Sequence, residues 1–251
     1  MCCFTQPVES VSSTKIFARM GRAGEQYVAY AMSLEARRTL AMVLPVPVVK
    51  GAGEDAMRFI NLEKYPALFD DLWDGFPVST LTRGGKSVAA VMPPQTLKVR
   101  KVGSYDASFV PTIADFSRLD ARFRFPDDVW RRLPGYRDYG FAVFKLRRSR
   151  GKVHPMAFSF PSATPQTLFF PTLHIHDGEI HAEAEFDHTL YCQGGGINAK
   201  GWRESPRIAM QFVKAELTEG LVLPNHHVYQ RKMRGMLANG DVLLRARVLA
   251  A

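Results

Sequence analysis

Short apolar runs broken by proline and glycine are the feature that most constrains this chain, because that spacing is typical of strands joined by turns. Residues 16–19 and 26–32 are two such runs on either side of a glycine-containing turn at 21–24, and they predict a β-hairpin. A third strand is expected at 40–44, where Pro45 and Pro47 remove ladder donors and end the strand or place it at an edge.

Later segments extend this pattern and add a few helices. Strands are expected at 139–146, 156–160 and 168–175, and Asn239-Gly240 predicts a type I′ hairpin turn near the end of the chain. The apolar spacing of 55–74 predicts one or two short helices broken near Pro66, and another helix is expected to begin at Pro126. We therefore predict an α+β fold, an antiparallel-sheet-rich single domain over 1–251 with a few short helices.

Composition limits the compartment and the partners. The 251 residues are 46% hydrophobic, but no run reaches the roughly 18 apolar residues of a membrane span. The first residues also lack the basic and apolar parts of a secretory signal, so a cytoplasmic protein without a membrane partner is expected. Three cysteines, two of them adjacent, do not make a disulfide framework.

The formal charge of +9 favours polyanions, and basic residues gather at 98–101 and 145–152. The remaining lysines and arginines are spread along the chain, so nucleic acid is a possible partner without being the favoured one.

Several short motifs resemble an uncharacterised bacterial domain family with a cysteine-bearing N-terminus and a W-V-L-P-V-P hallmark. They are Cys2-Cys3-Phe4, Pro7-Val8, Ile16-Phe17-Ala18, Tyr30 and, above all, Met42-Val43-Leu44-Pro45-Val46-Pro47. Residues 154–160 and 170–173 are similar to its later pattern, in which an apolar strand precedes a second strand containing proline. Methionine stands here in place of the hallmark tryptophan, and the resemblance implies one coherent domain without an activity to transfer.

The densest chemical signal is a histidine cluster in residues 170–193. A two-residue turn at Asp177-Gly178 would place His181 directly opposite His174 in an antiparallel hairpin. Side-chain alternation then gathers one polar face, which comprises His174, His176, Glu179, His181 and Glu183.

Three imidazoles on one face predict a transition-metal site of His174, His176 and His181, with copper, iron or zinc as the ion. Glu179 or Glu183 would act as a hydrogen-bonding partner or general base. The corresponding function is a metal-dependent enzyme acting on a small molecule or peptide, with oxidoreductase favoured over hydrolase. The alternative interpretation of the same pattern is the solvated polar face of an ordinary hairpin.

Two other functions stay open from the sequence. In the first, the chain is a non-enzymatic module that binds metal or nucleic acid. In the second, removal of Met1 exposes Cys2 as the N-terminal nucleophile of a hydrolase. His188 and Cys192 fall on the opposite face of the predicted hairpin, where Cys192 is interpreted as an ordinary core residue. Either of the adjacent His226 and His227 is a candidate fourth metal ligand.

Overall fold

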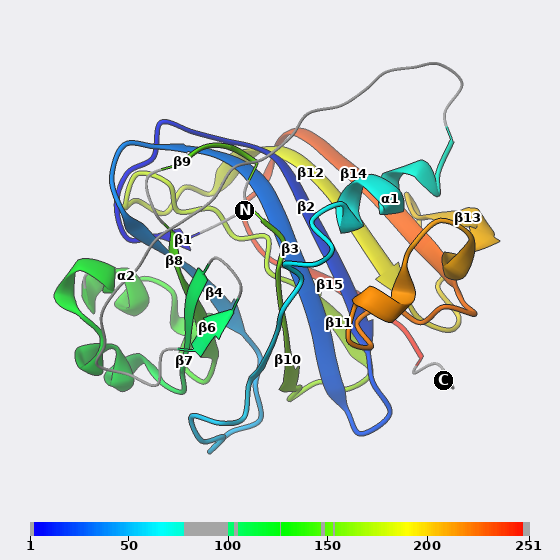
Figure 1. Ribbon diagram of the computed structural model, residues 1–251. Coiled ribbons are helices and arrows are strands. Elements are labelled where there is room, and N and C mark those ends of the chain that lie inside the picture. The colour runs from blue at the N-terminus through cyan, green and yellow to red at the C-terminus, as the bar shows by residue number, and fades with distance from the viewer. Residues whose placement is uncertain are drawn as a thin grey trace.

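The fold is mostly β, so the predicted α+β class is wrong. A computed structural model describes residues 3–77, 100–102, 105–125, 127–146, 149–152 and 154–247. Within these ranges, three sheets form the body of the molecule and the helices are short (Figure 1). The sequence predicts that the apolar runs are partly helices and partly strands, whereas in the structure most of them are strands.

The larger sheet has the order β13-β14-β12-β2-β3-β10-β5, with β9 also paired to β3. Neighbours are antiparallel except β12 and β2, which are parallel. The predicted hairpin of residues 16–32 is confirmed as β2 and β3. The strands of this sheet are β2 (Ser10–Met20), β3 (Glu25–Ala36), β5 (Arg58–Ile60), β9 (Ser149–Lys152), β10 (Met156–Pro161), β12 (Glu183–Gln193), β13 (Arg203–Ile208) and β14 (His227–Ala238).

The second sheet has the order β1-β4-β8-β7-β6 and is antiparallel throughout. Its strands are β1 (Cys3–Phe4), β4 (Leu40–Val46), β6 (Arg100–Val102), β7 (Tyr105–Val110) and β8 (Gly140–Leu146). The strands expected at 40–44, 139–146 and 156–160 are thus confirmed as β4, β8 and β10.

A third, two-stranded sheet joins β11 (Thr167–Phe170) to β15 (Val242–Arg245). The hairpin predicted at Asn239-Gly240 is therefore wrong, because β15 pairs with β11 whereas β14 pairs with β12 and β13. The strand expected over 168–175 also ends early, at Phe170.

Both large sheets are covered on two faces, which explains why their strands have apolar residues in succession rather than in strict alternation. Ile16 and Ala18 of β2 face the core between the sheets, whereas Phe17 packs against α1 on the outer face. In the same way, Met42 of β4 faces the central core and Val43 packs beneath the helical turns of residues 113–131.

The helices are shorter than the sequence predicts. They are α1 (Leu68–Asp74), α2 (Asp127–Arg131) and the 3-10 turns η1 (Ile113–Arg118), η2 (Ala121–Phe123), η3 (Pro134–Tyr136), η4 (Ala209–Gln211) and η5 (Ala215–Leu217). Of the region 55–74, only the part after Pro66 is helical, and β5 occupies residues that were expected in a helix. Within the described part of the chain, no helix has the length and apolar character needed to span a bilayer.

Candidate functional site

The backbone of residues 171–182 does not form the predicted histidine hairpin. Gly178 does adopt a left-handed turn conformation with φ 88°, but the residues on either side of it are not paired in a ladder. Ile175 forms an isolated parallel bridge with Cys3 of β1, and β12 begins only at Glu183. The hairpin is wrong because this segment takes its hydrogen bonds from elsewhere in the fold.

Those bonds come from the connection between β14 and β15. Asp241 Oδ1 accepts the backbone N–H groups of Thr172 and Leu173 at 2.6 and 2.9 Å. Asn239 accepts from the N–H of His174 at 2.7 Å. Side chains therefore satisfy the donors that a strand partner would satisfy, and they fix the path of residues 172–174.

Three imidazoles meet in the resulting pocket, but one of them was not in the predicted set. The Nε2 atoms of His174 and His188 are 3.4 Å apart, within hydrogen-bond contact. The rings of His174 and His188 have centroids 5.1 Å apart, and His176 stacks on the other side of His174 at 4.9 Å. His174 also contacts the ring of Phe186 at 4.5 Å.

His188 reaches this position because it lies on the core face of β12. Phe186, Leu190 and Cys192 alternate with outward residues on this strand and belong to the central core, as the sequence predicts for this face. His188 occupies the same phase and is only 2% exposed. The alternation of His188 with Phe186 and Leu190 was the sequence feature that could have placed it in the core. The incorrect hairpin instead assigned His188 to the face opposite His174.

Burial keeps these imidazoles uncharged. It lowers the pKa of His174 to about 2 and that of His176 to about 4, and it also lowers the pKa of His188. The neighbouring imidazoles act in the same direction on His174 and His188, because a second positive charge would be repelled. All three side chains are therefore neutral at pH 7, with Nε2 of His176 buried and without a hydrogen-bond partner among the described residues.

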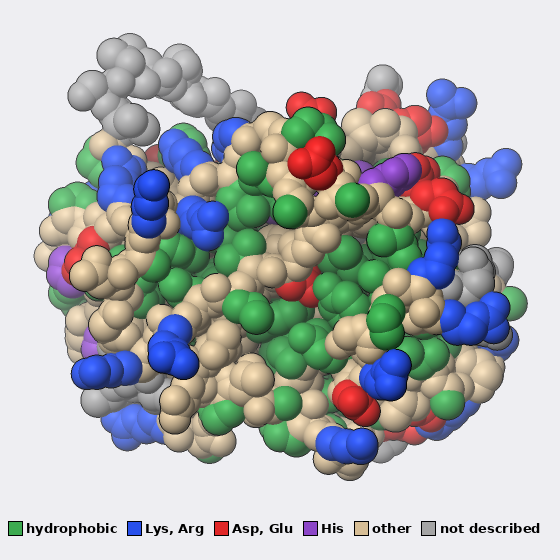
Figure 2. Space-filling view, turned by 180° about the vertical axis from the view of Figure 1, so that it is seen from behind, with side chains coloured by type: hydrophobic (Ala, Val, Ile, Leu, Met, Phe, Trp, Pro, Cys, Tyr) green, Lys and Arg blue, Asp and Glu red, His purple; other side chains and the backbone are tan. Residues whose placement is uncertain are grey.

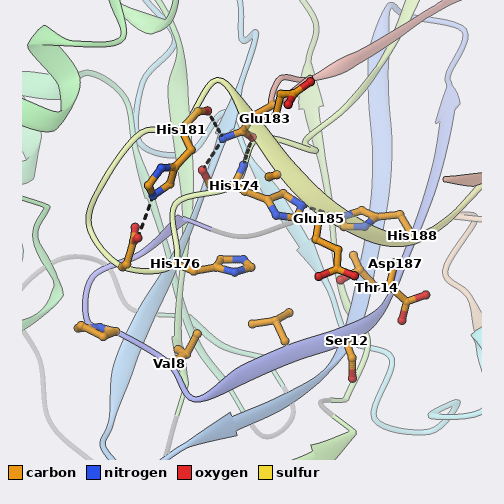
Figure 3. Close-up of a pocket in the computed structure, with 15 residues that line it drawn as sticks. Val8, Ser12, Thr14, His174, His176, His181, Glu183, Glu185, Asp187 and His188 are labelled. Carbon is orange, nitrogen blue, oxygen red and sulfur yellow. Dashed lines mark hydrogen bonds and ion pairs between the residues drawn. The ribbon is translucent and has the colours of Figure 1, made fainter. Parts of the chain in front are cut away.

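The pocket has a volume of about 540 Å³ and opens to solvent through an acidic rim. Val8 and the first residues of β2 form one wall, and the histidines form the other (Figure 3). Four carboxylates line it, namely Asp177, Glu183, Glu185 and Asp187. In the view of Figure 2, histidine and acidic side chains also lie together at the surface near the upper right edge.

The predicted residue His181 lines this pocket but is not part of the stack. Its Nε2 contacts Asp177 Oδ2 at 2.9 Å at the surface, and its ring turns away from His174 (Figure 3). Glu179 is also directed elsewhere, because Arg132 donates to it at 2.7 Å. Glu183 lies at the exposed start of β12 on the pocket rim.

None of the other sequence candidates within the described residues lines the pocket. Cys2 lies outside the described residues. His227 Nδ1 contacts the carbonyl of Ser205 at 2.8 Å, and neither His226 nor His227 lines the pocket. Cys192 is fully buried in the central core, where desolvation raises its pKa, so its interpretation as a core residue is confirmed.

Within the described ranges, no group of three or more His, Cys, Asp or Glu side chains is arranged to hold a metal ion. Basic side chains are scattered over the face in Figure 2 rather than gathered in one patch. Of the two basic clusters in the sequence, residues 98, 99, 147 and 148 lie outside the described ranges.

Comparisons with known proteins give a result at the level of fold. No family model and no curated protein matches the sequence, so the bacterial resemblance gains no support. Among solved structures, baculovirus P35 matches 98% of this chain and 100% of its own, with a TM-score of 0.51 and 13% identity. The fold is that of P35. A structure of the caspase-8/P35 complex matches over 94% of this chain and 96% of that chain, at a TM-score of 0.47 and 11% identity.

Proposed function

We propose that this chain binds a protein partner, and that the partner is a cysteine protease of the caspase type. The observation that carries the proposal is the end-to-end likeness to P35, which spans all of that chain and nearly all of this one. P35 is itself known in complex with caspase-8. Because the match covers the whole P35 chain, every part of P35 that could contact a partner has a counterpart in this fold.

An exposed basic surface on β13 and β14 supports a protein-binding role. Arg203, Lys232 and Arg234 belong to these strands, and the pKa of Lys232 is lowered by desolvation and by the two nearby arginines. Lys232 Nζ lies 4.2 Å from the centre of the Trp73 ring on α1. Arginine and aromatic side chains are enriched in protein interfaces, and clustered positive charge selects an acidic partner surface.

The first experiment is a direct binding measurement. Purified chain is titrated onto immobilised active caspase-8, with papain, an unrelated cysteine protease, as the control surface. We expect saturable binding to caspase-8 only, with slower association at higher salt because attraction between complementary charged surfaces is screened. Absence of binding to caspase-8 and to other active caspases would contradict the proposal.

Charge reversal tests whether the basic surface takes part. Lys232→Glu and Arg203→Glu are expected to reduce the association rate, because each introduces repulsion with an acidic partner. Lys50→Glu is the matched control, since Lys50 lies in the loop after β4 with a side chain 88% exposed and changes the net charge equally. Equal effects of all three substitutions would mean that net charge, rather than this surface, sets the rate.

A further inference from the structure

Two buried imidazole nitrogens in the pocket lined by His174, His176 and His188, called here the histidine pocket, are separated by the distance expected for two ligands of one metal ion. Nε2 of His174 and Nε2 of His188 are 3.4 Å apart. Two nitrogens bound to one zinc ion at about 2.0–2.1 Å in tetrahedral geometry are also about 3.3–3.4 Å apart. The fold therefore holds two imidazole nitrogens at the distance of one tetrahedral edge.

The rim of the pocket is acidic, so it attracts cations to the mouth of the pocket. The pocket contains four carboxylates, although the chain as a whole has a formal charge of +9. Asp187 is paired with Arg234 at 3.2 Å and Asp177 contacts His181 at 2.9 Å. Glu185 has no ion pair among the described residues and lies on the rim of the pocket.

We propose that this pocket binds one metal ion of the zinc type, with Nε2 of His174 and Nε2 of His188 as its two nitrogen ligands. Since the described residues present no third ligand in place, water molecules take the remaining positions around the ion. One of the two Nε2 atoms carries a hydrogen in the metal-free protein, so binding moves that imidazole to its Nδ1–H tautomer. The site is independent of the proposed protease binding.

Both anchoring residues are fixed before the ion arrives. His188 lies within β12, which is paired on one side with β2 and on the other with β14. The backbone N–H and C=O of His174 are both bonded to the side chain of Asn239. Ion binding therefore does not have to order either of these two residues, and the entropy lost on binding is small.

The test is calorimetric titration of tag-free, metal-free chain with Zn²⁺ at pH 7, in a Cys2→Ser background so that this thiol does not compete. We expect about one ion per chain, and a tetrahedral absorption spectrum when Co²⁺ replaces Zn²⁺. His174→Phe and His188→Phe keep a ring in the stack but remove the ligand nitrogen. Each should weaken Zn²⁺ binding more than about tenfold, because even outer-sphere partners change metal affinity by about 10- to 100-fold.

His181→Ala is the matched control, since His181 lines the same pocket with its ring directed to Asp177, and it should bind Zn²⁺ as the parent does. A parallel measurement needs no variant in the stack: Zn²⁺ should shift the ring nitrogen NMR signals of His174 and His188 and leave that of His181 in place. No Zn²⁺ binding by the parent, unchanged affinity in both phenylalanine variants, or a shift confined to His181 would each overturn the proposal.

Discussion

Asn239 binds His174 with both ends of its side-chain amide. Its Oδ1 accepts the His174 N–H at 2.7 Å, and its Nδ2 donates to the His174 carbonyl at 2.9 Å. Nδ2 also donates to the carbonyl of His181 at 2.9 Å. One side chain thus replaces the neighbouring strand that the histidine segment lacks, and it connects the two ends of that segment.

Removal of this amide is expected to destabilise the protein. Asn239→Ala leaves the N–H and C=O of His174 without protein partners, and each unsatisfied buried group costs about 1–3 kcal/mol. Chemical denaturation monitored by far-UV circular dichroism measures the loss. Asn225→Ala is the control, because Asn225 is exposed on the loop before β14. Equal stability of the two variants would show that the amide bonds do not hold the segment.

The stability of the metal-free protein should fall with acid. His176 has a folded pKa lowered by burial to about 4, below the ordinary value of 6.5. Between pH 6.5 and about 4, His176 binds a proton in the unfolded chain but not in the folded chain. The free energy of unfolding is therefore highest above pH 6.5 and decreases as the pH falls towards 4. Each buried neutral histidine lowers the free energy of unfolding by about 1.4 kcal/mol per pH unit over this range.

Denaturation at pH 7, 6, 5 and 4 in the presence of a chelator tests this dependence. His176→Phe keeps the ring contact with Phe4, whose centroid lies 5.7 Å away, and removes the titrating group. We expect the variant to lose less stability than the parent over this range. Parallel curves for the two proteins would contradict a buried neutral His176.

The thiol of Cys192 should be unreactive in the folded protein. It is fully buried in the central core, and desolvation raises its pKa, so the nucleophilic thiolate is scarce and inaccessible. Alkylation with iodoacetamide followed by peptide mass analysis should label Cys192 only in denaturant. Labelling under native conditions at the rate of a free cysteine would mean that β12 opens readily.

Arg19 is expected to be irreplaceable by lysine. Its guanidinium donates to the carbonyls of Leu221 and Gly220 and lies 3.8 Å from the centre of the Tyr27 ring. A lysine ammonium cannot reproduce this planar set of donors, and each charged hydrogen bond lost costs about 1.5–3 kcal/mol. Thermal unfolding compares Arg19→Lys with Arg37→Lys, in which the arginine is 84% exposed and should be replaceable without loss.

Local sequence patterns predicted the strands with apolar runs, but they predicted the partners only of strands that follow one another in the chain. The β2–β3 hairpin follows from adjacent runs and a glycine turn, and the structure confirms it. Asn239-Gly240 is an equally good local turn signal. No hairpin forms at Asn239-Gly240, because β15 pairs with β11 and the Asn239 side chain is hydrogen-bonded to the backbone of His174.

The candidate site was predicted in part for the same reason. His174 and His176 lie together in the pocket, but the partner of His174 is His188 rather than His181. Gly178 has the positive φ that suits a turn, but no hairpin forms around it, because the predicted register depended on a ladder that Asn239 and Asp241 prevent. Bonds between segments far apart in the chain are not encoded in local periodicity.

The parallel pairing of β2 with β12 bears on how the chain is made. Residues 14–19 leave the ribosome long before residues 188–193, which are their neighbours in the finished sheet. Until then one edge of β2 offers unpaired backbone groups to other nascent chains, and contacts of such long sequence separation form slowly. A chain cut short before β12 is thus expected to aggregate through this edge rather than remain a folded fragment.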